Sequence, residues 1–312
     1  MTKSRVTPSV PASIGTHRQA YLLLVVLALV WGGHWAVTKV GLRDIPPFTY
    51  GALRVATGLA TLAVLLAARG RLRRPPRSDL PVVLSVGIGQ IAAGIALMNL
   101  ALQVVPAGRS SVLLYTMPLW VAIIQATVLR RGLDPCQAGG VALGLVGIAA
   151  LLNPTVIDWS NPGQLVGSVA LLASAIIWAA TTIQLRHHRW EASPLELLPW
   201  QLLVALVPLA ALAIGLEGNQ PVHWGIGALL VVAYSGPLAS GFGYWATQSI
   251  TRTLNPIETT MGFLAVPVVG LASGTIFLGE PMGLVDVVGF VVTVGAIAVV
   301  SLSPGSTQEA DS

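Results

Sequence analysis

The sequence places aromatic, polar and titratable side chains at helical spacing inside apolar stretches. Trp31, His34 and Thr38 follow one another at intervals of three and four residues, which puts them on one face of a helix. The unperturbed pKa of histidine is about 6.5, so this side chain exchanges protons near neutrality. His34 is therefore a candidate for proton coupling. The alternative is a neutral ring that is hydrogen-bonded to a neighbouring helix.

A second group of this kind lies in the other half of the chain. Trp178 and Thr181 occupy the matching place in a later apolar stretch, and Tyr244 and Gln248 lie one helical turn apart. Aromatic rings with a few amide and hydroxyl groups suit a small, partly apolar zwitterion or amphiphile. We expect these residues to line a substrate cavity. The alternative is that the aromatic side chains only anchor helices at the membrane interfaces.

Two prolines sit within apolar stretches beside further polar residues. Ser111, Tyr115, Pro118 and Gln125 share one helical phase, and Thr260 and Pro267 hold the same phase later in the chain. A proline inside a helix removes a backbone hydrogen bond and frees a carbonyl. The pattern predicts hinges at the two prolines and a polar cavity lining along both helices. A packed kink, with hydroxyls bonded to their own helix, is the alternative.

Three charged residues are candidates for coupling or gating. Arg54 lies six residues into its apolar stretch, about 9 Å deep at 1.5 Å per residue. It could bind a substrate carboxylate or reach back to the interface. Arg109 and Glu258 start two later stretches, and they would either face opposite mouths of a pathway or stabilise helix ends.

No catalytic pattern accompanies these residues. None of the five histidines is followed by glutamate, no Gly-x-Ser-x-Gly occurs, and neither Lys3 nor Lys39 follows a glycine. The sequence therefore predicts no enzyme, no metal site and no cofactor. The single cysteine, Cys136, excludes an internal disulfide. A passive channel or a membrane-embedded sensor stays open as an alternative to a carrier.

The elements that position these side chains are membrane-spanning helices. With 54% hydrophobic residues, 9% charged residues and a mean hydropathy of +0.77, the chain has too little polar surface for a soluble globule of 312 residues. A spanning helix needs about 20 apolar residues. Such runs are predicted near 20–38, 48–68, 81–104, 108–129, 136–153, 163–185, 196–216, 224–249, 256–278 and 283–302.

The basic residues predict the orientation of these ten helices. With the N-terminus inside, thirteen of the 17 lysines and arginines fall in inside segments, three fall outside, and Arg54 lies within a span. Both termini are therefore expected in the cytoplasm of a bacterium, with the protein in its inner membrane. The net charge of +5 is then a topology signal, so no nucleic-acid partner is expected.

The sequence also repeats itself. A shift of 147 residues superposes Trp31 on Trp178 and Arg54 on Gln201, and a shift of 149 superposes Gly94 on Gly243 and Pro118 on Pro267. We expect a tail at 1–19, repeats at 20–153 and 154–302, and a tail at 303–312. Five helices per repeat would start the second repeat on the opposite side of the membrane. Inverted repeats of this kind are typical of carriers that work by alternating access.

These residues resemble the drug/metabolite transporter superfamily, in its ten-helix EamA-like branch. The resemblance covers about 20–302 and rests on short motifs: Trp31-Gly32-Gly33, Pro47 with Arg54, Pro118, Gly140, Trp178, Pro267, and Leu278-Gly279-Glu280-Pro281 followed by Gly289. It implies export or exchange of amino acids or related small metabolites without ATP hydrolysis. The partners expected are a small-molecule substrate, the lipid bilayer and a proton or counter-substrate, for a monomer or homodimer.

The sequence departs from the family pattern at two places. The first repeat has Arg130-Arg131-Gly132 where the second has Gly279-Glu280-Pro281. A role for that acidic turn therefore applies to the second repeat only. His34 is the other departure, since the family more often carries a small or amide residue there.

Overall fold

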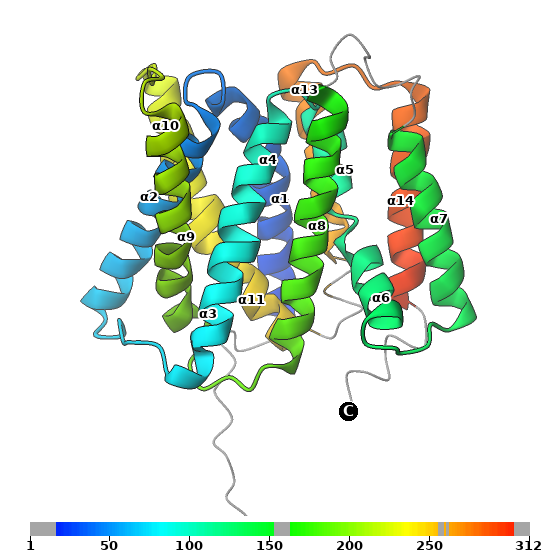
Figure 1. Ribbon diagram of the computed structural model, residues 1–312, viewed down its shortest axis with the longest axis horizontal. Helices are drawn as coiled ribbons and strands as arrows, with labels where there is room; N and C mark the ends of the chain where they lie inside the picture. Colours follow the sequence, from blue (N-terminus) through cyan, green and yellow to red (C-terminus); the bar gives the residue numbers. More distant parts are fainter. Residues whose placement is uncertain (1–16, 153–162, 255–258, 260–261, 303–312) are drawn as a thin grey trace, which may run out of the picture.

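The computed structural model describes residues 17–152, 163–254, 259 and 262–302, and every regular element in this part is a helix (Figure 1). The first repeat contains α1 (His17–Gly41), α2 (Pro47–Ala68), η1 (Arg77–Asp79), α3 (Leu80–Ser85), η2 (Val86–Ala93), α4 (Gly94–Leu102), α5 (Ala107–Leu114), α6 (Met117–Thr127) and α7 (Pro135–Leu151). The second contains α8 (Gly163–His187), α9 (Pro194–Glu217), α10 (Ile226–Tyr234), η3 (Ser235–Phe242), α11 (Gly243–Thr253), α13 (Ala265–Leu278) and α14 (Leu284–Leu302).

Eight helical segments of the described chain are long and apolar enough to cross a membrane. Two further apolar helices, α7 and α13, are shorter and lie where the fifth and ninth crossings are predicted. Large apolar side chains face outward on several helices, including Val64, Ile214 and Phe277, which are 69%, 77% and 77% exposed. Such faces fit a lipid environment. The count of ten crossings stays a prediction.

Four of the predicted runs are interrupted rather than continuous, one of them by the turn at Leu264 just before α13. η2 and η3 are π-helical, and they lie 149 residues apart, at the same place in the two repeats. The third break separates α5 from α6 at Tyr115 and Thr116. A π-helix shifts the hydrogen-bond pattern by one residue and leaves a carbonyl without its usual partner. Pro237 within η3 lacks the N–H that a regular α-helix would use.

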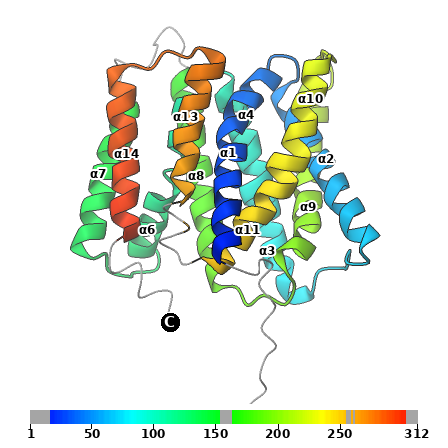
Figure 2. The ribbon, with the colours of Figure 1, turned by 180° about the vertical axis from the view of Figure 1, so that it is seen from behind.

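The packing of the helices is related by exchange of the two repeats. α1 packs on α13, and correspondingly α8 packs on α5 and α6; α1 packs on η3 and α11, and α8 on η2 and α4. α2 contacts η3, and α9 contacts η2. α2 also lies beside α9, and α7 beside α14, which the views from both sides show (Figures 1 and 2). A central group of helices is thus built equally from both repeats.

α1 and α8 run in opposite directions through this bundle. The carboxylate of Glu217, at the end of α9, accepts hydrogen bonds from the backbone N–H groups of Phe48 and Thr49 at the start of α2. At the other end, Arg71 just after α2 pairs with Glu196 at the start of α9. α2 and α9 are therefore antiparallel, and α1 and α8, which precede them across short loops, run in opposite directions too.

A close contact between α2 and η3 fixes part of the centre. A Cβ atom at Gly58 would lie 2.9 Å from the backbone oxygen of Gly236, and one at Gly236 would collide with Thr57. Glycine at both positions lets the two backbones approach closely. This contact brings the π-helical η3 against the middle of α2, next to Arg54.

Candidate functional site

A cavity lies among the central helices of both repeats. It is lined by Trp31, His34 and Trp35 of α1, Arg54 of α2, Gln90, Gly94, Ile95 and Met98 of η2 and α4, Leu114 and Tyr115 of α5 and its end, Ser174 and Trp178 of α8, and Tyr244 of α11. It offers about 50 Å³ to the centre of a water molecule. One water needs roughly 10–15 Å³ by this measure, so this conformation has room for several waters. A ligand larger than a few waters would need the walls to move apart.

Two tryptophans at repeat-related positions meet at this cavity. The rings of Trp31 and Trp178 lie 5.8 Å apart, and Trp31 lies 5.8 Å from Tyr244, both in edge-to-face geometry. Nε1 of Trp31 donates to the carbonyl oxygen of Ala239 at 2.9 Å. That carbonyl belongs to η3, so the π-helix supplies an acceptor that holds the ring. Trp31 is 9% exposed, so its ring packs inside the bundle and does not face outward.

His34 joins a row of buried hydroxyl groups. Its Nδ1 lies 3.2 Å from Oγ1 of Thr38, one turn further along α1. The hydroxyl of Tyr50 donates to Oγ1 of Thr38 at 3.4 Å, and it lies 2.6 Å from Oγ of Ser235 in η3. The ring of His34 stacks on Tyr234 at 6.0 Å. The partner of the imidazole is thus a hydroxyl on its own helix.

Arg54 is buried on the wall of the cavity. Its side chain is 4% exposed, and Nε donates to Oγ of Ser240 in η3 at 2.7 Å. Nη1 has no hydrogen-bond partner. The guanidinium of Arg54 is thus held beside η3 inside the bundle.

Thr38, which bonds His34, does not line the cavity, and three further predicted residues lie near it without lining it. Oγ1 of Thr181 donates to the carbonyl of Trp178 at 2.9 Å and lies 3.5 Å from Oε1 of Gln90. Nε2 of Gln248 donates to Oε1 of Gln201 at 3.2 Å. Oγ of Ser111 donates to the carbonyl of Gly108 at 2.7 Å. Thr181 and Ser111 thus bond back to their own helices.

The stripe predicted along the proline-containing helices is not a single face. Tyr115 lines the cavity, Ser111 is buried against α13, and Gln125 is half-buried in α6. The break after Leu114 resets the helical phase, so spacing in the sequence no longer predicts a shared face. Thr260 and Glu258 lie outside the described residues.

The two prolines differ from the mid-span kinks expected of them. Pro118 lies in the first turn of α6, and Pro267 is the third residue of α13, after a turn at Leu264. The N–H groups of a first turn have no hydrogen-bond partner within the helix, so a proline there costs no hydrogen bond. Each proline therefore begins a helix instead of bending one. Whether the breaks act as hinges stays a prediction.

Three polar residues of the site were not predicted from the sequence. Gln90 of η2 and Ser174 of α8 line the cavity. Ser240 of η3 does not line it but accepts the hydrogen bond from Arg54. Gln90 carried a signal, because it is a polar residue after Gly87-Ile88-Gly89 in an apolar run. A single serine in a helix carries none, since its hydroxyl can bond its own backbone.

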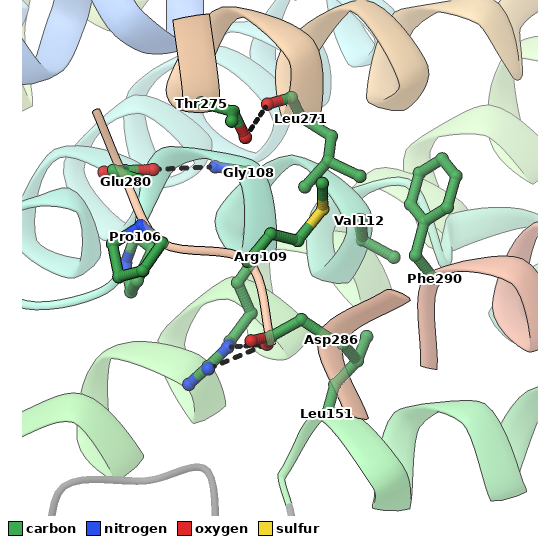
Figure 3. Close-up of a pocket in the computed structure, with 12 residues that line it drawn as sticks. Pro106, Gly108, Arg109, Val112, Leu151, Leu271, Thr275, Glu280, Asp286 and Phe290 are labelled. Carbon is green, nitrogen blue, oxygen red and sulfur yellow. Dashed lines mark hydrogen bonds and ion pairs between the residues drawn. The ribbon is translucent and has the colours of Figure 1, made fainter. Parts of the chain in front are cut away.

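A cluster of charges lies at one end of the bundle; we call Lys39, Arg109, Glu280 and Asp286 the end cluster. Nζ of Lys39 lies 2.8 Å from Oε1 of Glu280, and Nη2 of Arg109 lies 2.8 Å from Oδ1 of Asp286. Glu280 also accepts from the backbone N–H groups of Ala107 and Gly108 at 3.0 and 3.4 Å. Figure 3 shows Arg109 directed at Asp286 and Glu280 directed at Gly108, on the walls of a small cavity.

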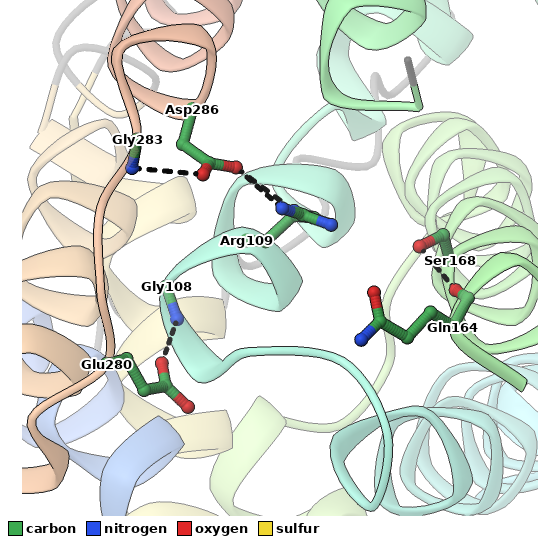
Figure 4. A network of polar contacts seen from close by, with 7 residues as sticks. All are labelled: Gly108, Arg109, Gln164, Ser168, Glu280, Gly283 and Asp286. Carbon is green, nitrogen blue, oxygen red and sulfur yellow. Dashed lines mark hydrogen bonds and ion pairs between the residues drawn. The ribbon is translucent and has the colours of Figure 1, made fainter. Parts of the chain in front are cut away.

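The end cluster joins three parts of the chain. Gly279 ends α13 in a left-handed conformation, with φ 65°, and presents Glu280 to the start of α5. Asp286 in the first turn of α14 faces Arg109 of α5, whereas Gln164 and Ser168 of α8 lie on the other side of Arg109 (Figure 4). The described partner of Arg109 is therefore Asp286, and the four charges form two ion pairs.

Comparisons with known proteins agree over most of the chain. The EamA-like transporter family matches residues 18–153 and 165–302. A probable amino-acid metabolite efflux pump of Salmonella typhimurium is 27% identical over 300 residues, covering 90% of this chain and 94% of its own. The uncharacterized transporter YoaV of Bacillus subtilis is 24% identical, with 85% and 91% covered. A protein of known crystal structure, 22% identical, has the same fold, with a TM-score of 0.62 over 91% of this chain and 96% of that one.

Proposed function

The chain belongs to the EamA-like transporter family, and from this premise we propose that it is a secondary transporter that exports or exchanges amino acids or related small metabolites. The observation that carries the proposal is the central cavity, because both repeats build it and Trp31 and Trp178 meet there from repeat-related positions. The name of the Salmonella typhimurium relative supports metabolites of amino acids as the substrate class.

Alternating access is the proposed mechanism. The opposed directions of α1 and α8, and packing that is preserved when the repeats are exchanged, support two states that differ by which repeat adopts which conformation. The end cluster would close one mouth of the pathway, and breaking its two ion pairs would open it. The breaks at η2, η3 and between α5 and α6 supply places where helices can bend.

The proposal includes the placement of the protein in its membrane. Ten crossings are inferred from the apolar runs, and both termini are placed in the cytoplasm by the distribution of basic residues. A bacterial inner membrane is the proposed location. His34 is the proposed proton-coupling residue, since its ring lines the cavity and connects through Thr38 and Tyr50 to Ser235. Exchange against a second metabolite would need no such group.

Counterflow in proteoliposomes tests the proposal. The full chain is reconstituted, and uptake of a trace of labelled amino acid is measured with and without a high internal concentration of the same compound. A carrier is expected to give saturable uptake that the internal compound stimulates. Uptake that rises linearly with concentration and ignores the internal compound would support a channel instead.

A further inference from the structure

Arg54 is a buried cation whose charge is not compensated by the protein around it. The side chain is 4% exposed, Nε bonds the neutral hydroxyl of Ser240, and Nη1 has no partner. An arginine cannot lose its charge in a protein. Burying a charge is costly unless an opposite charge accompanies it, and the cost is greatest for a side chain inside a membrane.

The described carboxylates do not provide that opposite charge. Asp79 pairs with His188, Glu280 with Lys39 and Asp286 with Arg109, all at the ends of the bundle. Glu196 pairs with Arg71, and Glu217 accepts from the start of α2. Within the described residues, the lining of the central cavity contains neither aspartate nor glutamate. An anion that enters the cavity would therefore complete the site.

The geometry of Arg54 fits a carboxylate. Guanidinium groups bind carboxylates through two parallel N–H···O bonds, which gives both energy and orientation. The bond from Nε to Ser240 fixes the plane of the group, and the buried Nη1 is left without a protein acceptor. A carboxylate would therefore pair with the Nη1–Nη2 edge once the cavity opens. Because Ser240 belongs to η3, a bound anion would connect α2, η3 and the transported molecule.

A second unpartnered polar group lies on the cavity wall. Oγ of Ser174 in α8 is buried, with the residue 1% exposed, and has no hydrogen-bond partner. A hydroxyl accepts from an ammonium or donates to and accepts from another hydroxyl. The remaining walls are largely aromatic and aliphatic, including Trp31, Trp178, Tyr244 and Met98.

We propose that the cavity recognises a monocarboxylate with an apolar or aromatic body, and that Arg54 binds its carboxylate. This inference rests on the proposed transport function and narrows its substrate class. The lining supplies no acidic group for an ammonium, so the carboxylate is the required charge and the amino group is dispensable. α-Hydroxy acids should then be accepted as well as α-amino acids, whereas the amine that lacks the carboxylate should be rejected.

Three matched compounds test this proposal: phenylalanine, 3-phenyllactate and phenethylamine. Counterflow of labelled phenylalanine is measured in proteoliposomes with each compound as competitor. Wild-type protein is expected to be inhibited by phenylalanine and phenyllactate and to ignore phenethylamine. Arg54→Gln should lower transport of both acids at least tenfold. Arg54→Lys should retain part of the transport, because lysine keeps the positive charge but cannot form the two parallel N–H···O bonds of a guanidinium group. Arg43→Gln, at an exposed loop arginine, is the control and should transport like wild type.

The outcomes separate this proposal from the proposed function. Transport of the acids by Arg54→Gln at the wild-type rate, or competition by phenethylamine as strong as that by phenyllactate, would overturn the role of Arg54 and leave the transporter standing. Thermal unfolding in detergent provides a readout that needs no transport. Phenyllactate should raise the unfolding temperature of wild type and not that of Arg54→Gln. If phenyllactate raises the unfolding temperature of wild type only, but no counterflow is seen, the binding site at Arg54 is supported and the transport function is refuted. If phenyllactate raises the unfolding temperatures of both proteins equally, the binding site at Arg54 is refuted.

Discussion

At the scale of single residues, side chains of the cavity form hydrogen bonds from one repeat to the other: Trp31 to Ala239 and Arg54 to Ser240. Spacing in the sequence grouped Trp31, His34, Trp178 and Tyr244, and the structure places all four on one cavity, because they lie in uninterrupted parts of their helices. Their role in binding a substrate stays a prediction. It failed for Ser111 and Gln125, because the helix breaks between them. The orphan hydroxyl of Ser174 could not be predicted, since its lack of a partner depends on tertiary packing.

Trp31 provides a test of the hydrogen bond that η3 supplies. Trp31→Phe keeps an aromatic ring but removes the donor to the carbonyl of Ala239. Loss of a buried hydrogen bond that leaves its acceptor unsatisfied costs about 1–3 kcal/mol, so a lower thermal unfolding temperature is expected in detergent. Trp224→Phe is the control, because that ring is 56% exposed and surface changes usually stay within about 0.5 kcal/mol. Equal unfolding temperatures for Trp31→Phe and Trp224→Phe would contradict this account.

Variants of His34 and Gln248 test which residues line the cavity. His34 lines the cavity, whereas Gln248 bonds Gln201 behind it. Because His34 lines the cavity, His34→Ala is expected to lower the rate of counterflow at least tenfold, which corresponds to about 1.4 kcal/mol in the activation free energy. Gln248 does not line it, so Gln248→Ala is expected to change the rate by less than about threefold. The rates are measured in proteoliposomes containing equal amounts of folded protein. A larger loss in Gln248→Ala than in His34→Ala would mean that the lining is assigned to the wrong residues.

At the scale of elements, apolar runs located the helices and missed their interruptions. A π-helix changes the hydrogen-bond partner by one residue, and hydropathy does not register that change. Only the backbone of the structure shows that η2 and η3, 149 residues apart, are both π-helical. The prolines were visible in the sequence, but only the turns before them show that they begin helices rather than bend them.

The close contact of α2 with η3 gives a prediction at this scale. Gly58→Ala places a methyl group 2.9 Å from the backbone oxygen of Gly236, and such overpacking typically costs about 1–3 kcal/mol. Gly215→Ala in α9 is the matched control, because no atom lies within 4 Å of its added methyl group. Alanine there should leave stability unchanged or raise it by about 0.5–1 kcal/mol. Thermal unfolding measures both, and similar stability of the two variants would show that α2 and η3 are not in close contact.

At the scale of the whole molecule, the repeat was visible in the sequence as matches at shifts of 147 and 149 residues, and the packing of the helices is preserved when the two halves are exchanged. The end cluster was not predicted. Lys39 and Glu280 are 241 residues apart in the chain, and single-sequence reasoning gives no reason to pair them before α1 and α13 are known to be neighbours.

The end cluster predicts how one mouth of the pathway opens. Glu280→Gln removes the charge that pairs with Lys39 and weakens the bonds to Ala107 and Gly108. We expect Val112→Cys, on the wall of the small cavity behind these ion pairs, to react several-fold faster with a membrane-impermeant maleimide. The exposed Cys136 is first replaced by alanine. Arg71→Gln, which breaks the ion pair with Glu196 at the other end, is the control and should leave the rate unchanged. No acceleration in Glu280→Gln would mean that the cluster does not hold this mouth closed.

Access to the central cavity from each side of the membrane tests the central claim most directly. Ser174→Cys, in a chain whose Cys136 is alanine, places one thiol on the cavity wall. Its labelling by an impermeant maleimide is measured in right-side-out and in inside-out vesicles, with and without phenyllactate. The account predicts labelling from both sides and slower labelling from each side when phenyllactate is present. Labelling from one side only, or rates that phenyllactate does not change, would contradict a substrate cavity that opens alternately to the two faces.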